Sequence, residues 1–132
     1  MRLTIKSLGH ALSGLKHAFV QERNVRKFLM LWGGLAVAAL LLKFEIVQWI
    51  IFLLVGLCFL TVELINTAIE RITDTIDDDR KQANSGHFHP GIKMAKDVAA
   101  AASLLALIMF GIVQVLLFLP NILMLFFDHP QA

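Results

Sequence analysis

Three long runs of apolar residues constrain this chain more than any other feature of its sequence. They fall within residues 28–44, 46–64 and 98–119. Each approaches the roughly 20 residues that a helix needs to cross the hydrocarbon core of a bilayer. The runs are continuous rather than alternating, which excludes the strands of a membrane β-barrel, and in lipid a spanning backbone must satisfy its own hydrogen bonds. We therefore expect three membrane-spanning helices.

The composition agrees with a membrane protein. Of the 132 residues, 58% are hydrophobic and 17% are charged, and the mean hydropathy is +0.72. A single domain of this size has too little interior to hide so much apolar surface from water. A soluble enzyme, a disulfide scaffold and a disordered tail are therefore excluded. The net charge of +2 is too small to indicate nucleic acid as a partner.

The positions of the basic residues predict an orientation. Eleven of the twelve Lys and Arg residues lie either before residue 28 or between residues 71 and 96. The positive-inside rule places both segments in the cytoplasm. We therefore expect a multi-pass membrane protein with its N-terminus, a loop at about 75–92 and any active site on the cytoplasmic side. Lys43-Phe44-Glu45 would form a tight outer hairpin.

The segment before the first span has the pattern of an amphipathic helix at about residues 3–20. One face carries Ile5, Leu8, Leu12, Leu15 and Phe19, and the other carries Lys6, His10, Ser13, Lys16 and His17. This pattern is typical of a helix in the interface plane with its cationic side toward lipid headgroups, whether it serves the site or only anchors the chain. We expect an all-α membrane protein, with this surface helix and three spans in one domain over residues 1–132.

A polar stripe begins where the second apolar run ends. No loop signal follows the run, so we expect the helix to continue through Glu63, Asn66, Glu70 and Asp74. Their spacing places all four side chains on one helical face over roughly 16 Å. A carboxylate at the edge of hydrocarbon costs on the order of 2.5–3.5 kcal/mol and is usually paired or functional. Glu63 is therefore a candidate base for an alcohol proton, the alternative being a helix end whose carboxylates simply reach water.

Other charges complete a possible phosphate site. Glu70 and Asp74 offer the oxygen ligands that Mg²⁺ prefers when it also holds phosphate. Residues 21–27 and 93–97 mix acids with bases at two further helix ends, where they could bind a nucleoside triphosphate or form a snorkelling collar. No Walker-type glycine loop is present, so side chains would hold the phosphates.

Four segments then match a known pattern. They are Ser7-Leu-Gly-His-Ala-Leu-Ser-Gly-Leu15, Glu22-Arg-Asn24, Val62-Glu-Leu-Ile-Asn-Thr-Ala-Ile-Glu70 and Ala95-Lys-Asp-Val-Ala-Ala100. Together they resemble the prokaryotic diacylglycerol kinase and undecaprenol kinase family over about residues 5–110. The resemblance implies a homotrimer whose active sites lie at subunit contacts. It also implies transfer of the γ-phosphate of Mg-ATP to a membrane lipid hydroxyl, which gives undecaprenyl phosphate or phosphatidic acid.

The resemblance also implies roles for single residues. Glu63 matches the catalytic base, and Asn66 matches its partner in the same motif. Glu22 and Glu70 match the carboxylates that hold Mg²⁺. The nucleotide-binding positions are matched by Glu22, Glu70, Asp74, Lys96 and Asp97.

Alternatives remain open for the lipid substrate and for the class of protein. The motifs at Glu22–Asn24 and Lys96–Ala100 are closer to the undecaprenol kinase branch, which slightly favours undecaprenol over diacylglycerol. A small transporter or channel subunit would use Glu63 as an intramembrane carboxylate, but this leaves the other charge clusters unexplained. In a purely structural assembly subunit, the acids of the stripe would affect only stability.

The chain departs from the family pattern in two places. The 21 residues between Asp74 and Lys96 exceed the family's loop, and Asp77–Asp79 within them are expected beyond the helix end because their charge opposes the macrodipole there. His87 and His89 in this segment are expected in a solvated turn rather than a metal site. The second departure is the apolar extension after Pro120.

Overall fold

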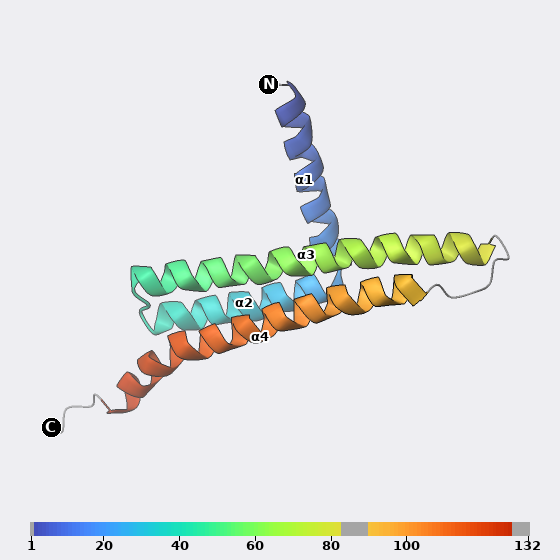
Figure 1. Ribbon diagram of the computed structural model, residues 1–132. Helices are drawn as coiled ribbons and strands as arrows, with labels where there is room; N and C mark the ends of the chain where they lie inside the picture. The colour runs from blue at the N-terminus through green and yellow to red at the C-terminus, as the bar shows by residue number, and fades with distance from the viewer. Residues whose placement is uncertain (1, 83–89, 128–132) are drawn as a thin grey trace.

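The computed structural model describes residues 2–82 and 90–127, and these residues form four helices without a strand. The helices are α1 (Arg2–Gln21), α2 (Arg23–Leu41), α3 (Ile46–Gln82) and α4 (Pro90–Phe127). Helices α2, α3 and α4 run side by side as a bundle, and α1 projects from it across the bundle axis (Figure 1). The expected all-α fold is confirmed.

Three of the helices have the properties of membrane spans. Helices α2, α3 and α4 are each long and apolar enough to cross a membrane. Most of their large apolar side chains are exposed in the single chain, Met30, Leu105 and Leu116 among them. An exposed apolar surface around a bundle is the expected arrangement for helices surrounded by lipid. With the bundle across the bilayer, the direction of α1 in Figure 1 is that of a helix lying along the membrane surface.

Aromatic rings hold the three spans together. Phe28 on α2 lies against Phe59 on α3 and Phe110 on α4, with ring centroids 4.3 and 5.2 Å apart. Near the α2–α3 hairpin, Phe44 packs on Phe118 of α4 at 4.7 Å. These two clusters lie at different levels of the bundle, so they fix the spans against one another along much of their length.

A single residue separates α1 from α2. Glu22 has an extended backbone, with φ −84° and ψ 117°, so the helix breaks at this residue. Its N–H group still donates to the carbonyl oxygen of Ala18 at 3.0 Å, and its own carbonyl oxygen accepts from the N–H of Arg26. The chain therefore turns sharply from α1 into the bundle, and the Glu22 side chain lies at this corner.

The helix of the second span is longer than the sequence predicted. Residues 75–82 are helical rather than part of a loop at 75–92, and Asp77–Asp79 lie inside α3, so both expectations were wrong. Arg80 and Lys81 occupy the last turn of α3, where positive charge is favourable for the macrodipole. Lys81 also pairs with Asp78 at 3.2 Å. These basic residues compensate for the acids that were expected to end the helix.

The last span is also longer than predicted. Helix α4 begins at Pro90, a favourable first helical residue, and ends at Phe127 instead of near residue 119. Pro120 lies inside it, and the helix bends toward its C-terminal end (Figure 1). A proline lacks the N–H group for one helical hydrogen bond, which is a common cause of such a bend. The apolar extension therefore continues the third span, whereas His87 and His89 lie outside the described residues.

A close approach between α2 and α3 gives a prediction about stability. The indole of Trp32 lies so near the backbone of Gly56 that a Cβ there would overlap the ring. Trp32 has little room to move because it lies near Phe28 and Phe52, with centroids 5.7 and 5.9 Å away. We predict that Gly56→Ala destabilises the protein by about 1–3 kcal/mol, measured as a lower thermal midpoint in detergent.

Gly111→Ala is the matched control, because no heavy atom of the described residues lies within 4 Å of the position that a Cβ would take at that helical glycine. It is expected to leave the thermal midpoint unchanged or to raise it, since alanine is the better helix former. Equal midpoints for the two variants would contradict the packing of Trp32 on Gly56.

Candidate active site

The polar stripe of α3, defined by Glu63, Asn66, Glu70 and Asp74, runs along the seam between α3 and α4. Glu63 and Asn66 are buried, at 5% and 6% exposure, whereas Glu70 is half-buried and Asp74 is exposed. Contacts to α4 are made by Glu63 at one end and by Asp74 at the other. The single polar face predicted from the spacing is therefore present, and its burial decreases along the helix.

The deepest member of the stripe has a neutral partner. The hydroxyl of Ser103 on α4 donates a hydrogen bond to Glu63 Oε2, and both side chains are buried. This bond satisfies one carboxylate oxygen without placing a positive charge beside it. Ser103 was not predicted from the sequence. The available signal was its position as the only polar side chain between Val98 and Val113.

The next two members form a pair within α3. Asn66 Nδ2 donates to Glu70 Oε1 at 3.0 Å, while Asn66 Oδ1 is buried without a hydrogen-bond partner among the described residues. An unpaired amide oxygen beside a carboxylate fits Mg²⁺, which binds through one or two protein carboxylates together with phosphate oxygens and water. Within the described residues, no cluster of three His, Cys, Asp or Glu side chains forms a complete metal site.

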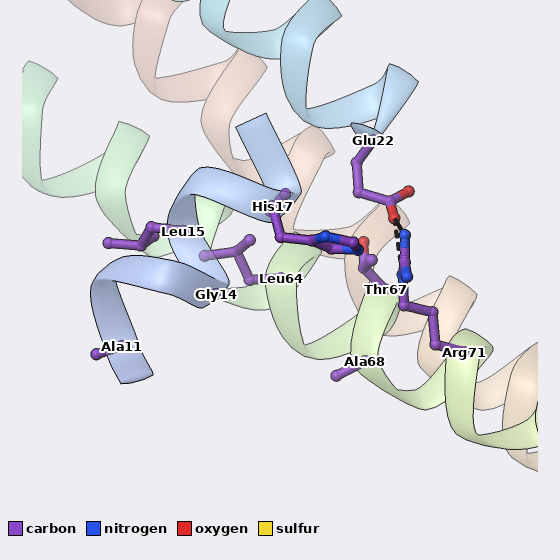
Figure 2. A pocket seen from close by; sticks show the side chains of 10 residues that line it. Ala11, Gly14, Leu15, His17, Glu22, Leu64, Thr67, Ala68 and Arg71 are labelled. Atoms are coloured by element: carbon purple, nitrogen blue, oxygen red, sulfur yellow. Dashed lines mark hydrogen bonds and ion pairs between the residues drawn. The ribbon is translucent and has the colours of Figure 1, made fainter. Parts of the chain in front are cut away.

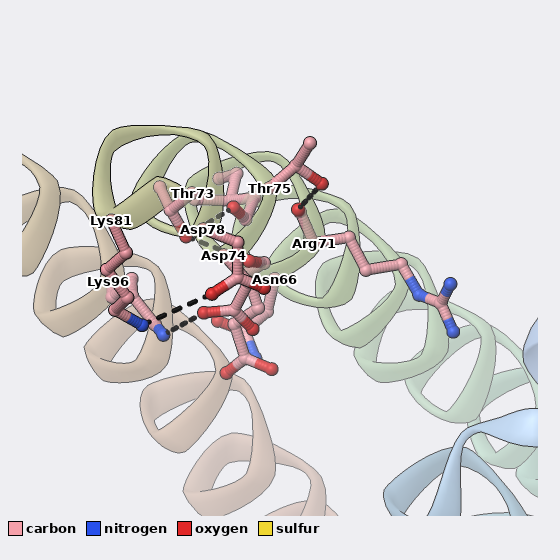
Figure 3. A network of polar contacts seen from close by, with 10 residues as sticks. Asn66, Arg71, Thr73, Asp74, Thr75, Asp78, Lys81 and Lys96 are labelled. Carbon is pink, nitrogen blue, oxygen red and sulfur yellow. Dashed lines mark hydrogen bonds and ion pairs between the residues drawn. The ribbon is translucent and has the colours of Figure 1, made fainter. Parts of the chain in front are cut away.

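The exposed end of the stripe pairs with α4. Lys96 Nζ lies 2.6 Å from Asp74 Oδ1, and Figure 3 shows the lysine reaching across from α4 to α3. Two predicted nucleotide-binding residues are thus in direct contact. Asp97 follows Lys96 at the same end of α4 and is exposed.

Glu22, the other predicted Mg²⁺ ligand, lies in a different environment. Its Oε1 atom accepts from Arg71 Nε at 2.9 Å and Arg71 Nη2 at 2.5 Å (Figure 2). Arg71 follows Glu70 in sequence, so its side chain leaves α3 about 100° around the helix from that of Glu70. Within the described residues, the Glu22 carboxylate is bonded to Arg71 rather than to the stripe.

Besides a cavity of about 800 Å³ that includes Asn66, two smaller cavities adjoin these groups. One, of about 400 Å³, is lined by the polar residues Asn24, Lys27, Glu63 and Ser103. Its apolar lining comes from Phe28, Leu31, Phe59, Leu104 and Leu107. The other, of about 330 Å³, lies between α1 and α3 and includes His17, Glu22 and Arg71 (Figure 2). The first cavity places a carboxylate beside an apolar surface, which suits an amphiphile with a polar reactive end.

The fold and the site together define a class of protein. Three apolar helices carry a seam in which a buried carboxylate, an amide–carboxylate pair and a lysine–aspartate pair follow one another. Groups of this kind serve proton transfer and the binding of charged phosphates at a membrane surface. The class is that of a membrane-embedded enzyme acting on an amphiphilic substrate.

Comparison with known proteins identifies the family. The family model described as prokaryotic diacylglycerol kinase matches residues 9–118. The undecaprenol kinase of Bacillus subtilis is 36% identical over 118 residues, which cover 89% of each chain. The diacylglycerol kinase of Helicobacter pylori is 36% identical over 110 residues, or 82% of this chain and 78% of that relative. This chain belongs to the prokaryotic diacylglycerol kinase family.

Membership of the family confirms the lipid kinase predicted from the sequence. The transporter or channel alternative is not favoured. The roles of single residues, the use of Mg²⁺ and the homotrimer stay predictions.

Proposed function

We propose that this chain transfers the γ-phosphate of Mg-ATP to the hydroxyl of undecaprenol or diacylglycerol at the cytoplasmic face of a bacterial inner membrane. The observation that carries the proposal is the position of Glu63, which is 5% exposed and borders a cavity with an apolar lining. A lipid alcohol in that cavity would bring its hydroxyl to a carboxylate while its chain stays against apolar side chains. The family to which the chain belongs supports the same reaction.

In this proposal Glu63 is the general base. It takes the proton of the lipid hydroxyl as the lipid oxygen forms a bond to the γ-phosphorus of ATP. The bond from that phosphorus to the β–γ bridging oxygen breaks, and ADP leaves. Phosphoryl transfer needs mainly positioning and charge stabilisation from the protein, so few residues are sufficient.

The rest of the stripe would hold the nucleotide. Lys96 would donate to phosphate oxygens, and its contact with Asp74 keeps the ammonium group at the end of the seam. Asp97 lies beside Lys96 and would contribute to the same nucleotide-binding end. Glu70 and the unpaired Oδ1 atom of Asn66 would hold Mg²⁺ together with the phosphates. When bound, Mg²⁺ neutralises charge on the transferred phosphoryl group.

We also propose that the enzyme is a homotrimer in which Glu22 acts at a subunit contact. In one chain the Glu22 carboxylate is bonded to Arg71 at the α1–α2 corner, whereas the stripe faces α4. The α1–α2 corner of one subunit would lie at the stripe of its neighbour. Glu22 of the first subunit and Glu70 of the second would then hold Mg²⁺ together. The resemblance of the motifs to those of a trimeric family supports this arrangement.

The assignment of the base is tested by Glu63→Gln, which keeps the shape of the side chain and removes its ability to take the proton. We expect phosphate transfer from labelled ATP to lipid in vesicles to fall by at least about a hundredfold. Glu45→Gln makes the same change at an exposed hairpin residue and should keep full activity. Near-normal turnover in Glu63→Gln would contradict the assignment.

The lipid substrate is tested by offering undecaprenol and diacylglycerol together in the same vesicles with Mg-ATP. We expect the isoprenoid alcohol to show the higher kcat/KM, since the motifs around Glu22 and Lys96 are closer to the undecaprenol kinase branch. Quantifying the two phosphorylated lipids gives the ratio directly. A ratio that favours phosphatidic acid would reverse this part of the proposal.

The shared site is tested by mixing two inactive variants. Glu22→Gln and Glu63→Gln should each be inactive alone, but subunits of both kinds in one trimer should regain part of the activity because some sites contain neither substitution. Each variant carries a different affinity tag, and purification on the two tags in succession isolates the mixed trimers. Mixed assemblies without activity would argue against Glu22 acting on the site of a neighbour.

A further inference from the structure

Ser103 is the one polar side chain on the buried face of α4 that contacts the proposed base. Its hydroxyl donates to Glu63 Oε2, a contact between residues 40 positions apart in the chain. Its neighbours on the same face of the helix are Ala99, Ala106 and Phe110, all buried and apolar. The serine is therefore the only hydroxyl that this face of α4 offers to Glu63.

The hydrogen bond from Ser103 distinguishes the two carboxylate oxygens of Glu63. Oε2 is occupied by Ser103, whereas Oε1 makes no hydrogen bond within the described residues. Glu63 and Ser103 both line the cavity of about 400 Å³ that also has an apolar lining. A group that enters this cavity would find one carboxylate oxygen already bonded and the other available.

A hydroxyl at this position has a specific chemical consequence. In water, a glutamate side chain samples several rotamers, and solvent surrounds both oxygens. Here a donor fixed on a neighbouring helix selects one orientation of the carboxylate before the substrate arrives. General base catalysis requires such an oxygen within hydrogen-bond reach of the proton that it takes.

We propose that Ser103 is a positioning residue that holds Glu63 through Oε2, so that Oε1 takes the proton of the lipid hydroxyl. The inference rests on the proposed function, because it assigns a role relative to Glu63 as the base. Ser103 itself forms no bond to the reacting phosphate. Its effect is on the rate of the transfer step and not on the binding of ATP, since Lys96 lies two helical turns away on α4.

The test compares Ser103→Thr with Ser103→Val in the purified full-length protein, with Mg-ATP and undecaprenol or diacylglycerol in vesicles. Threonine and valine have nearly the same shape and differ by the hydroxyl. We expect the valine variant to lose on the order of ten- to a hundredfold in kcat with an unchanged KM for ATP, and the threonine variant to stay close to the unaltered protein.

Two further variants separate positioning from packing. Ser103→Ala removes the hydroxyl without adding volume, so it should lose kcat as valine does, even if valine disturbs the seam. Gln114→Met replaces another buried polar residue of α4, three turns away, whose side chain has no hydrogen-bond partner in the described part of the chain. This variant should keep the original kcat. Thermal midpoints of all four variants show whether any loss of kcat follows a loss of stability.

Each result decides the inference. It is overturned by an alanine variant with unaltered kcat, by equal losses in the threonine and valine variants, or by losses that track the thermal midpoint. It is also overturned by a rise in KM for ATP at constant kcat. An unaltered alanine variant together with an inactive Glu63→Gln would remove the role of Ser103 and leave the proposed function intact, whereas an active Glu63→Gln would remove the base itself.

Discussion

A carboxylate inside a membrane protein needs a partner, and the seam between α3 and α4 is arranged around that requirement at Glu63. Its bond to Ser103 joins the two helices and so limits their rotation about their axes. Asp74 lies about 16 Å along α3 from this contact, whereas Lys96 lies about 10 Å along α4 from it. The long side chain of Lys96 covers the difference, so the buried contact also determines which residues meet at the exposed end.

Local features of this arrangement could be predicted from the sequence. The stripe of Glu63, Asn66, Glu70 and Asp74 depends only on helical periodicity. Once this segment was predicted to be helical, all four side chains fell on one face. The partners of the stripe depend on helix packing instead. Ser103 is 40 residues from Glu63, and Arg71 is 49 residues from Glu22, so nothing local in the sequence pairs them. The polar side of the site was therefore predictable, whereas the contacts that orient it were not.

The boundaries of α3 and α4 show a second limit. Three consecutive aspartates near a helix end oppose the macrodipole, and on that ground alone the helix was expected to end before them. The basic residues Arg80 and Lys81 follow immediately and act in the opposite sense, and Lys81 pairs with Asp78 one turn earlier. The macrodipole acts mainly on the last turn, where Arg80 and Lys81 outweigh Asp79, so the charge of that turn alone favours the longer helix.

The burial of the stripe changes along α3, and in the proposed function this change would order the substrates. Glu63 and Asn66 are buried, Glu70 is half-buried and Asp74 is exposed, so the accessibility of the stripe rises along one helix. A lipid hydroxyl remains tied to the membrane by its chain, whereas a nucleotide carries charge that cannot enter hydrocarbon. In the proposed function the two substrates would therefore approach the stripe from opposite ends, and the γ-phosphate would meet the hydroxyl where the burial changes. In that arrangement the membrane itself would exclude the wrong order of the substrates, so a small chain would be sufficient to direct the reaction.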